Sequence, residues 1–359
     1  MPVQHVLKLS GSIETHPGAG RPASLVRRLG KFGVFLARGH GPRLAWWLAG
    51  HDALKRADYR GISLAALESA WRADRSWRDI AADAGRVHSR ALGLEFKNGD
   101  AVDRGYATWR ALADRGWKFE RGNDGLIAHG NGLTLAISTA EEETMIKEIF
   151  FDRCYDFRLP GSWQVVDIGA NVGMAALFFA SQTWVNRVFS FEPFAPTADA
   201  FRSNLQLNLS LSQKISLSQT GLGANAATLS VDYHAALRGS MTLTGVGQWR
   251  GRPGTTGHPI LISVERASAA LSPIIAGRNG HRLLAKIDCE GSEYDILGDL
   301  DASGMLEYFS AFVIEWHARG PDELVRLLSG HGYALHVQPL SPDETALGLI
   351  YATKLPAES

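Results

Sequence analysis

From about residue 164 onward, short apolar segments alternate with longer segments whose apolar residues have helical spacing. The short segments lie near residues 164–168, 187–191, 214–218, 282–288 and 311–315. This alternation is typical of a parallel, doubly wound α/β sheet. Two more apolar segments, near residues 333–338 and 347–353, are separated by the turn-rich PLSPDET. They predict a hairpin, so the sheet of about seven strands should end in an antiparallel strand.

The N-terminal part of the chain has different patterns. Residues 1–22 become rich in Gly and Pro and are expected to be poorly ordered. The apolar spacing and the Ala, Leu and Arg content of residues 23–115 predict a helical region. Residues 116–140 alternate apolar and polar positions around N-D-G and N-G, which predicts a small β-hairpin segment. Residues 141–359 would then form the α/β domain, beginning with an amphipathic helix over residues 141–155.

Charge and cysteine content narrow the class of protein. The 359 residues include 37 Lys and Arg and 37 Asp and Glu, so the formal net charge is zero. Nucleic-acid binding normally needs a basic face, so a nucleic-acid partner is not expected. Cys154 and Cys289 stand far apart and in no metal-ligand spacing, as expected of reduced thiols in a cytoplasmic protein. We find neither a transmembrane stretch nor a signal-peptide pattern.

Residues 24–50 contain five Lys and Arg and no acid. One interpretation is an amphipathic segment on an anionic membrane surface. The other is a helix pair that packs on the main domain or on a second subunit. Glycines and a proline interrupt any long amphipathic helix here, which favours the second interpretation and a homodimer.

The segment VVDIGANVGMAALFFA, residues 165–180, carries the first chemical signal. An apolar strand ends at Asp167, small and turn-forming residues follow, and an apolar helical run begins at Met174. A strand, a tight Gly turn and a helix N-terminus form a nucleotide-sized pocket lined by backbone N–H groups. The next strand ends in FSFEPF, with Glu192 placed 25 residues after Asp167. That spacing suits an acid that accepts hydrogen bonds from ribose hydroxyls.

Two details favour S-adenosylmethionine over NAD in this pocket. Asp167 stands two residues before Gly169, where a carboxylate can orient the loop and meet a ligand ammonium group. The G-x-G-x-x-G spacing that cradles a pyrophosphate is absent. The terminal hairpin also fits the sheet of methyltransferases better than a simple dinucleotide domain.

The chain resembles the FkbM family of methyltransferases across about residues 130–353. Four segments carry the resemblance: IKEIFFDRCYDF, VDIGANVG, KIDCEGSE and VIEWH. It implies a Rossmann-like class I methyltransferase sheet and S-adenosylmethionine-dependent O-methylation of hydroxyls on sugars, polyketides and other secondary metabolites. Together with the reasoning above, it implies these cofactor-binding residues: Asp167, Gly169, Ala170, Asn171, Gly173, Glu192, Pro193, Gly221 and Asp288.

Candidate catalytic residues lie at the ends of the fourth and fifth predicted strands. They are Lys286, Asp288, Glu290, Glu293, Glu315 and His317. An alcohol acceptor must lose its proton, and an imidazole with an ordinary pKa near 6.5 makes His317 the first choice as general base. A divalent metal held by Asp288, Glu315 and His317 is an open alternative. A third interpretation is that these charged residues only form salt bridges at the strand ends. Residues there would also cap the following helices, as Ser292 and Glu293 could.

The sequence therefore predicts an S-adenosylmethionine-dependent methyltransferase that acts on a hydroxyl of a small molecule. The alternatives are an N-methyltransferase, an RNA methyltransferase, or a non-catalytic module that binds the cofactor and mediates assembly; a nicotinamide oxidoreductase is more distant. The Gly- and Arg-rich residues 238–259 are interpreted either as a mobile loop that closes on the substrate or as a solvated connection.

Overall fold

A computed structural model describes residues 79–83, 86–97, 100–156, 160–243, 257–340 and 347–354. The predictions for residues 1–22, for residues 24–50 and for the turn at residues 341–346 lie outside this part of the chain. None of the described helices has the length and apolar character needed to cross a bilayer.

A seven-stranded sheet forms the centre of the α/β domain, in the order β15-β16-β14-β13-β7-β8-β9. Its strands are β7 (Trp163–Ile168), β8 (Val185–Phe191), β9 (Ile215–Ser218), β13 (Arg282–Ile287), β14 (Phe309–His317), β15 (Tyr333–Pro339) and β16 (Leu347–Lys354). Strands β14, β13, β7, β8 and β9 run parallel, whereas β16 is antiparallel to both neighbours. The predicted class I methyltransferase sheet with an antiparallel last strand is confirmed.

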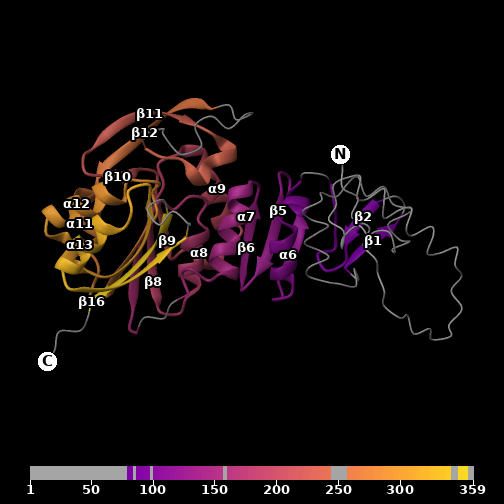
Figure 1. The fold of residues 1–359 in the computed structure, drawn as a ribbon, viewed down its shortest axis with the longest axis horizontal. Helices are drawn as coiled ribbons and strands as arrows, with labels where there is room; N and C mark the ends of the chain where they lie inside the picture. Colours follow the sequence, from indigo (N-terminus) through magenta and orange to yellow (C-terminus); the bar gives the residue numbers. More distant parts are fainter. Residues whose placement is uncertain are drawn as a thin grey trace, which may run out of the picture. The chain divides into compact units, whose positions relative to one another are not determined.

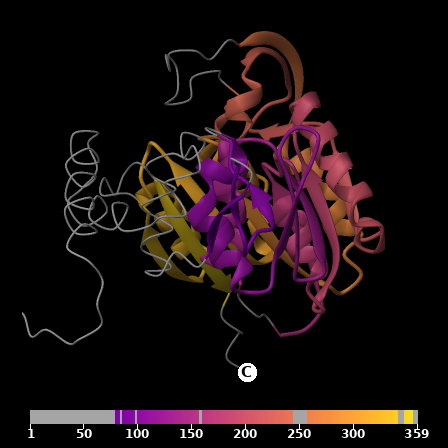
Figure 2. The same cartoon turned by 90° about the vertical axis from the view of Figure 1, so that its right-hand side faces the viewer.

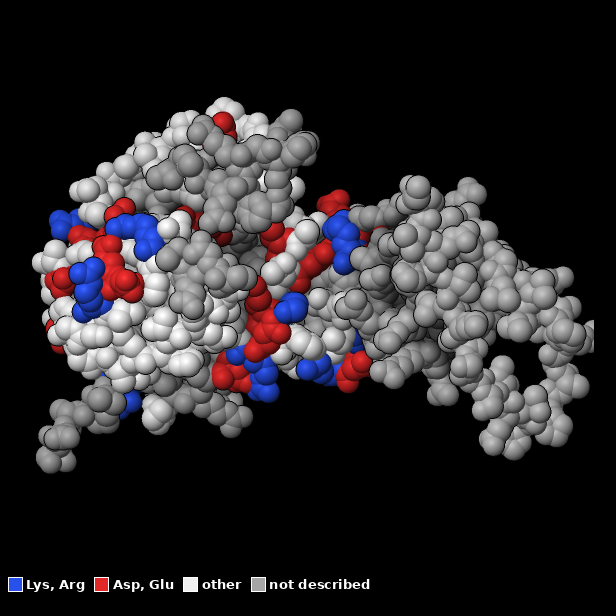
Figure 3. Space-filling view, viewed as in Figure 1, with Lys and Arg blue, Asp and Glu red and all other residues white. Residues whose placement is uncertain are grey.

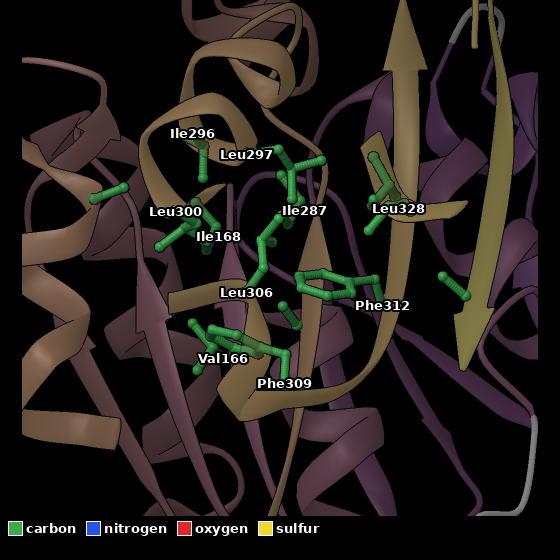
Figure 4. Close-up of a cluster of buried hydrophobic side chains, with 14 of the residues drawn as sticks. Val166, Ile168, Ile287, Ile296, Leu297, Leu300, Leu306, Phe309, Phe312 and Leu328 are labelled. Atoms are coloured by element: carbon green, nitrogen blue, oxygen red, sulfur yellow. The ribbon is translucent and has the colours of Figure 1, made fainter. Parts of the chain in front are cut away.

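Helices cover both faces of this sheet (Figure 1). On one face lie α11 (Ala267–Ala276), α12 (Glu293–Ala302) and α13 (Asp322–Gly330). Their apolar side chains form the core with the strands, as Ile287, Leu297, Phe312 and Leu328 show in Figure 4. The short 3-10 helix η4 (Met305–Tyr308) precedes β14. The other face is covered by α8 (Met174–Ser181), with α9 (Ala195–Gln206) and α10 (Leu209–Ser212) beside it.

The strand–turn–helix unit is mostly apolar and lies buried in the domain, with Gln164 and Asp167 as the buried polar residues of β7. All six residues of β7 are buried, as expected of a central parallel strand covered on both faces. Helix α8 is buried from Met174 through Ala180. A helix that is apolar all round belongs in a core, so this unit is held rigidly at the centre of the domain.

The predicted hairpin segment forms a sheet of three antiparallel strands, β4 (Lys118–Arg121), β5 (Leu126–Gly130) and β6 (Leu133–Ile137). It lies beside α9 (Figure 2). The side chain of Asn204 in α9 accepts a hydrogen bond from the N–H of Ala136 in β6, at 2.9 Å. Asn208, just after α9, accepts one from the N–H of Thr134, also at 2.9 Å. The hairpin is therefore joined to the α/β domain through side-chain amides. The helix after it is α7 (Ala140–Ile146), which continues as one π-helical segment, η2 (Lys147–Phe151).

Two parts of the fold differ from the sequence predictions. The described part of the region predicted as helical contains the short strands β1 (Ile80–Asp83), β2 (Arg86–Ser89) and β3 (Leu94–Glu95), followed by the helices α5 (Ala101–Arg104) and α6 (Tyr106–Ala113); residues 23–78 lie outside the described residues. Strands of two to four residues are too short to show a clear alternation.

A further sheet was not predicted at all. It consists of β10 (Gly221–Gly223), β12 (His258–Arg266) and β11 (Ala227–Tyr233), in that order. The sequence of β12, HPILISVER, carries a run of apolar residues that is compatible with a strand, but only Ile262 and Val264 of it are buried. Of the predicted loop at residues 238–259, the first part belongs to η3 (Ala235–Ser240) and the last to β12, while residues 244–256 lie outside the described residues.

Candidate active site

A cavity of about 960 Å³ opens at the carboxyl ends of β8, β7, β13 and β14. In an open α/β sheet this is where ligands bind. Because of the strand order, Glu192 and the Gly turn line its β7–β8 side, while Asp288, Glu315 and His317 line its β13–β14 side. We call these the turn side and the acidic side.

The turn after β7 has no room for a larger residue at its first position. Gly169 has φ +78°, and a Cβ there would lie 1.8 Å from the carbonyl oxygen of Asp288. The N–H groups of Gly169 and Ala170 both donate to the carbonyl oxygen of Phe191, at 3.1 and 3.0 Å. The turn is therefore fixed between the ends of β8 and β13.

Glu192 is 4% exposed and lines the turn side of the cavity. One carboxylate oxygen accepts the N–H of Asn171 and the other accepts the N–H of Phe194, each at 3.0 Å. Burial raises the pKa of Glu192 to about 7, although these two hydrogen bonds oppose the shift. Each oxygen keeps a further lone pair with which it can accept a hydrogen bond from a ligand.

Next to Glu192, the cavity wall is apolar. It contains Phe194, Gly221, Leu222, Met241 and Leu243. A Cβ at Gly221 would lie 3.1 Å from the Leu243 side chain and 3.4 Å from Pro193, so these two side chains flank the open face of the glycine. A flat aromatic ring suits such a slot.

Asp167 and Gly173 were expected to bind the cofactor, but neither is among the residues that line the cavity. Asp167 is fully buried. A Cβ at Gly173 would lie 2.0 Å from the Phe201 ring, so this glycine serves helix packing. The remaining residues expected to bind the cofactor, Gly169, Ala170, Asn171, Glu192, Pro193, Gly221 and Asp288, all line the cavity.

Lys286 connects the two sides of the cavity. Its ammonium nitrogen Nζ lies 2.8 Å from the carbonyl oxygen of Gly169 and 3.3 Å from Asp167 Oδ1. It also lies 3.5 Å from Asp288 Oδ2. Burial alone would lower the pKa of Lys286, but the two carboxylates outweigh it and raise the pKa. Lys286 therefore stays charged and cannot act as a base.

On the acidic side, Asp288, Glu315 and His317 each offer a ligand atom, and these atoms all lie within 4.8 Å of one another. Glu315 and His317 point to the cavity from one face of β14, whereas Trp316 is buried in the core on the other face. Strand β13 ends at Ile287, so Glu290 comes from the turn that follows, at φ +53°. Its Oε2 lies 3.7 Å from His317 Nε2.

Glu293 orients the imidazole of His317. This first residue of α12 is fully buried, and its Oε1 lies 2.9 Å from His317 Nδ1. The same oxygen accepts the N–H groups of Cys289 and Gly291, at 2.9 and 3.2 Å. The sequence offered Glu293 as one of the acids at the strand ends or as a cap; the structure adds the contact with His317, which no sequence spacing revealed because 24 residues separate the pair.

The pKa values on the acidic side do not agree with the expectation that His317 is an unprotonated general base at neutral pH. Burial alone would lower the pKa of His317, but the hydrogen bond to Glu293 and the charge of Glu290 raise it to about 10. Burial raises the pKa of Glu290 to about 8, and burial and Asp288 raise that of Glu315. At neutral pH His317 is thus protonated in this arrangement and has no free lone pair with which to accept a proton.

Comparison with known proteins shows the family of this chain. The family model described as the methyltransferase FkbM domain matches residues 167–335. The 31-O-demethyl-FK506 methyltransferase FkbM of Streptomyces tacrolimicus is 31% identical over 235 residues, which are 57% of this chain and 87% of that protein. The chain belongs to the FkbM family of methyltransferases.

Two other relatives match shorter parts of this chain. Methyltransferase 1 of Beauveria bassiana is 31% identical over 45% of this chain and 68% of its own length. Methyltransferase sdnD of Sordaria araneosa is 39% identical over 30% of this chain, and the match spans 42% of sdnD. A crystal structure of methyltransferase FkbM from Methylobacillus flagellatus superposes with a TM-score of 0.38 at 19% identity, covering 57% of this chain and 47% of that one.

Some cavity residues of this FkbM family member were not predicted from the sequence. Glu148 lines the cavity, and burial together with Asp288 raises its pKa to about 7. It stands in the family segment IKEIFFDRCYDF, between Lys147 and Ile149, and its place in that segment was the available signal. Glu141 accepts the N–H of Gly239 at 2.6 Å and so holds η3 against α7 at the cavity wall. Figure 3 shows acidic side chains gathered over the α7 region of this face.

Proposed function

We propose that this chain is an S-adenosylmethionine-dependent methyltransferase that methylates a hydroxyl group of a small molecule, such as a sugar or a secondary metabolite. The observation that carries the proposal is the two-sided cavity. A buried acid and an apolar slot lie on the turn side, and ionisable side chains suited to an acceptor lie on the acidic side, within one enclosure.

The residues of the turn side fit this cofactor. Glu192 can accept hydrogen bonds from ribose hydroxyls, and the wall formed by Phe194, Leu222 and Leu243 suits an adenine ring. Bound S-adenosylmethionine supplies a methyl group already activated by a sulfonium. Asp167 acts indirectly, because it holds Lys286, which in turn binds the Gly169 carbonyl of the turn.

Transfer to a hydroxyl is supported by the relative from Streptomyces tacrolimicus, whose name specifies an O-demethyl acceptor. The enzyme's task is to hold donor and acceptor in line at roughly 3–3.5 Å. Asp288, Glu290 and Glu315 can accept hydrogen bonds from acceptor hydroxyls. An amine acceptor is the second candidate, because carboxylates would also bind an ammonium group. RNA is disfavoured by the acidic cavity and by the zero net charge.

The cofactor can be tested by calorimetric titration with S-adenosylmethionine, S-adenosylhomocysteine and NADH. We expect one site per chain for both sulfur compounds and no binding of NADH. Glu192→Gln should weaken S-adenosylhomocysteine binding about tenfold or more, because a charge-assisted acceptor is lost. Glu265→Gln, an exposed acid of β12 outside the cavity, is the matched control. Equal affinities for the two variants, or binding of NADH alone, would contradict the cofactor assignment.

The acceptor class can be tested with methyl-labelled S-adenosylmethionine. The panel should contain sugars, hydroxylated polyketides, primary amines and transfer RNA. Label in an ether product supports the proposal, whereas label only in amines or RNA would replace it with the corresponding alternative.

A further inference from the structure

We propose that Asp288, Glu315 and His317 form a binding site for one divalent metal ion on the acidic side of the cavity. The inference deepens the proposed function: the ion's binding stands on the side chains alone, and only its role rests on methyl transfer.

The distances suit a single ion. The three ligand atoms lie within 4.8 Å of one another. Ligands that each lie about 2.1 Å from one metal are about 3.0–3.4 Å apart at octahedral or tetrahedral angles, so side-chain movements of roughly 1–2 Å close the site. Asp288 and Glu315 are about one quarter and one fifth exposed, which leaves their carboxylates room to make that movement.

The second observation is how His317 is held. The fully buried Glu293 accepts a hydrogen bond from Nδ1, which leaves Nε2 directed at Glu315 and Glu290, each 3.7 Å away. A metal-binding histidine characteristically donates its other ring nitrogen to a carboxylate in this way. Glu293 itself is anchored by two backbone N–H groups, so the ring is oriented before any ion arrives.

The surrounding charge also calls for a cation. Glu148 and Glu290 line the same side, and neither they nor Glu315 have a hydrogen bond to their carboxylates among the described residues. The Lys and Arg side chains that line the cavity are already engaged: Arg153 pairs with Asp156, Arg238 pairs with Glu142, and Lys286 contacts Asp167 and the Gly169 carbonyl. The contact of Lys286 with Asp288 is long, 3.5 Å, and involves Oδ2 only. A divalent ion would compensate the remaining carboxylates.

Two carboxylate oxygens and one imidazole nitrogen favour first-row ions such as Mn²⁺ or Zn²⁺ over Ca²⁺, which prefers an all-oxygen shell. Open coordination positions would face the cavity. An acceptor hydroxyl bound there becomes more acidic, and its proton passes to water. Binding of the ion displaces the Nε2 proton of His317, because only the neutral imidazole can be a ligand, and the bound ion then takes the place of a general base. No electron transfer is involved, so a redox-inert ion suffices.

The test is Mn²⁺ binding to the full chain after treatment with a chelator and desalting. Electron paramagnetic resonance reports free Mn²⁺, and metal analysis after dialysis gives the stoichiometry. We expect one Mn²⁺ per chain, competed by Zn²⁺. Asp288→Asn, Glu315→Gln and His317→Gln should each weaken binding more than tenfold, and Glu293→Gln should weaken it about 10- to 100-fold through the misoriented ring.

The matched control is Glu148→Gln, which removes the same charge from the same cavity but none of the three ligands. It should change Mn²⁺ affinity less than threefold. Absence of stoichiometric binding, or equal weakening in the Glu148 variant, would overturn the site. Circular dichroism and urea unfolding identify any variant that fails to fold, and the remaining ligand variants then decide.

The same titrations separate the two proposals. Cofactor binding without Mn²⁺ binding would overturn the metal site and leave the proposed function intact. Mn²⁺ binding without affinity for the sulfur compounds would overturn the proposed function and leave the metal site intact.

Discussion

On the turn side of the cavity, the buried carboxylate of Glu192 accepts two backbone N–H groups. On the acidic side, the carboxylates of Glu290 and Glu315 have no hydrogen bonds among the described residues and face one another around His317. The first arrangement is satisfied before a ligand binds, whereas the second places like charges together. The turn side is therefore preorganised for recognition. We propose the acidic side as the place for a positively charged ligand and for the chemistry that such a ligand supports.

Lys286→Met should cause the largest loss of unfolding free energy, because Lys286 contacts both the turn side and the acidic side. The substitution leaves Asp167 fully buried without its counter-ion. Loss of one partner of a buried ion pair costs about 3–5 kcal/mol. Urea unfolding at pH 7.5 would measure the loss. The additional change Asp167→Asn should recover more than half of it; if it recovers nothing, the pair is not the source of the stability.

Gly169→Ala should cause the second-largest loss of unfolding free energy, about 3 kcal/mol. The left-handed conformation at φ +78° costs a residue with a side chain about 1–2 kcal/mol, and the contact at 1.8 Å forces the Asp288 carbonyl to move. Gly280→Ala has a similar φ of +81° and nothing within 4 Å, so it should show the conformational cost alone. Equal losses in the two variants would mean that the turn and β13 are not tightly packed.

The same contrast explains what the sequence could reveal. Strands β7, β8, β13 and β14 and the Gly turn follow from local patterns, because each needs a run of apolar residues or a fixed backbone conformation. Those patterns also placed Glu192 and Glu315 correctly at the cavity. The contact between Glu293 and His317 joins two elements that no local rule connects, and the short strand β10 carries only three residues of signal. The burial of Asp167 was missed because its position beside a Gly turn is shared by ligand-binding acids and by acids that hold the turn.

The acidic side should make stability depend on pH. The pKa values of Glu148 and Glu290 are raised from 4.5 to about 7 and about 8, and that of His317 is raised from 6.5 to about 10. In each case the folded state binds the proton more tightly than the unfolded state. Stability is thus fully present at low pH and is lost as the pH rises through these folded-state values.

Between pH 5 and 8 we expect the metal-free protein to lose about 1–2 kcal/mol of unfolding free energy. Urea unfolding at a series of pH values would measure it. The double variant Glu148→Gln, Glu290→Gln should flatten the profile, and Mn²⁺ should restore stability at pH 8 in the unchanged protein. A profile that rises with pH would show that the carboxylates are compensated in some other way.

The smallest expected effect concerns the apolar slot. At Gly221→Ala the new Cβ would meet the flexible end of Leu243 at 3.1 Å and Pro193 at 3.4 Å, so stability should change by less than about 1 kcal/mol. The methyl group nevertheless enters the cavity wall and should weaken S-adenosylhomocysteine binding about three- to tenfold by calorimetry, without changing Mn²⁺ affinity. Gly223→Ala, on the same strand but outside the cavity lining, is the control and should leave both unchanged. If Gly221→Ala weakened Mn²⁺ binding as much as cofactor binding, the turn side and the acidic side would not be independent. The distinction between a preorganised side and a cation-dependent side would then have to be abandoned.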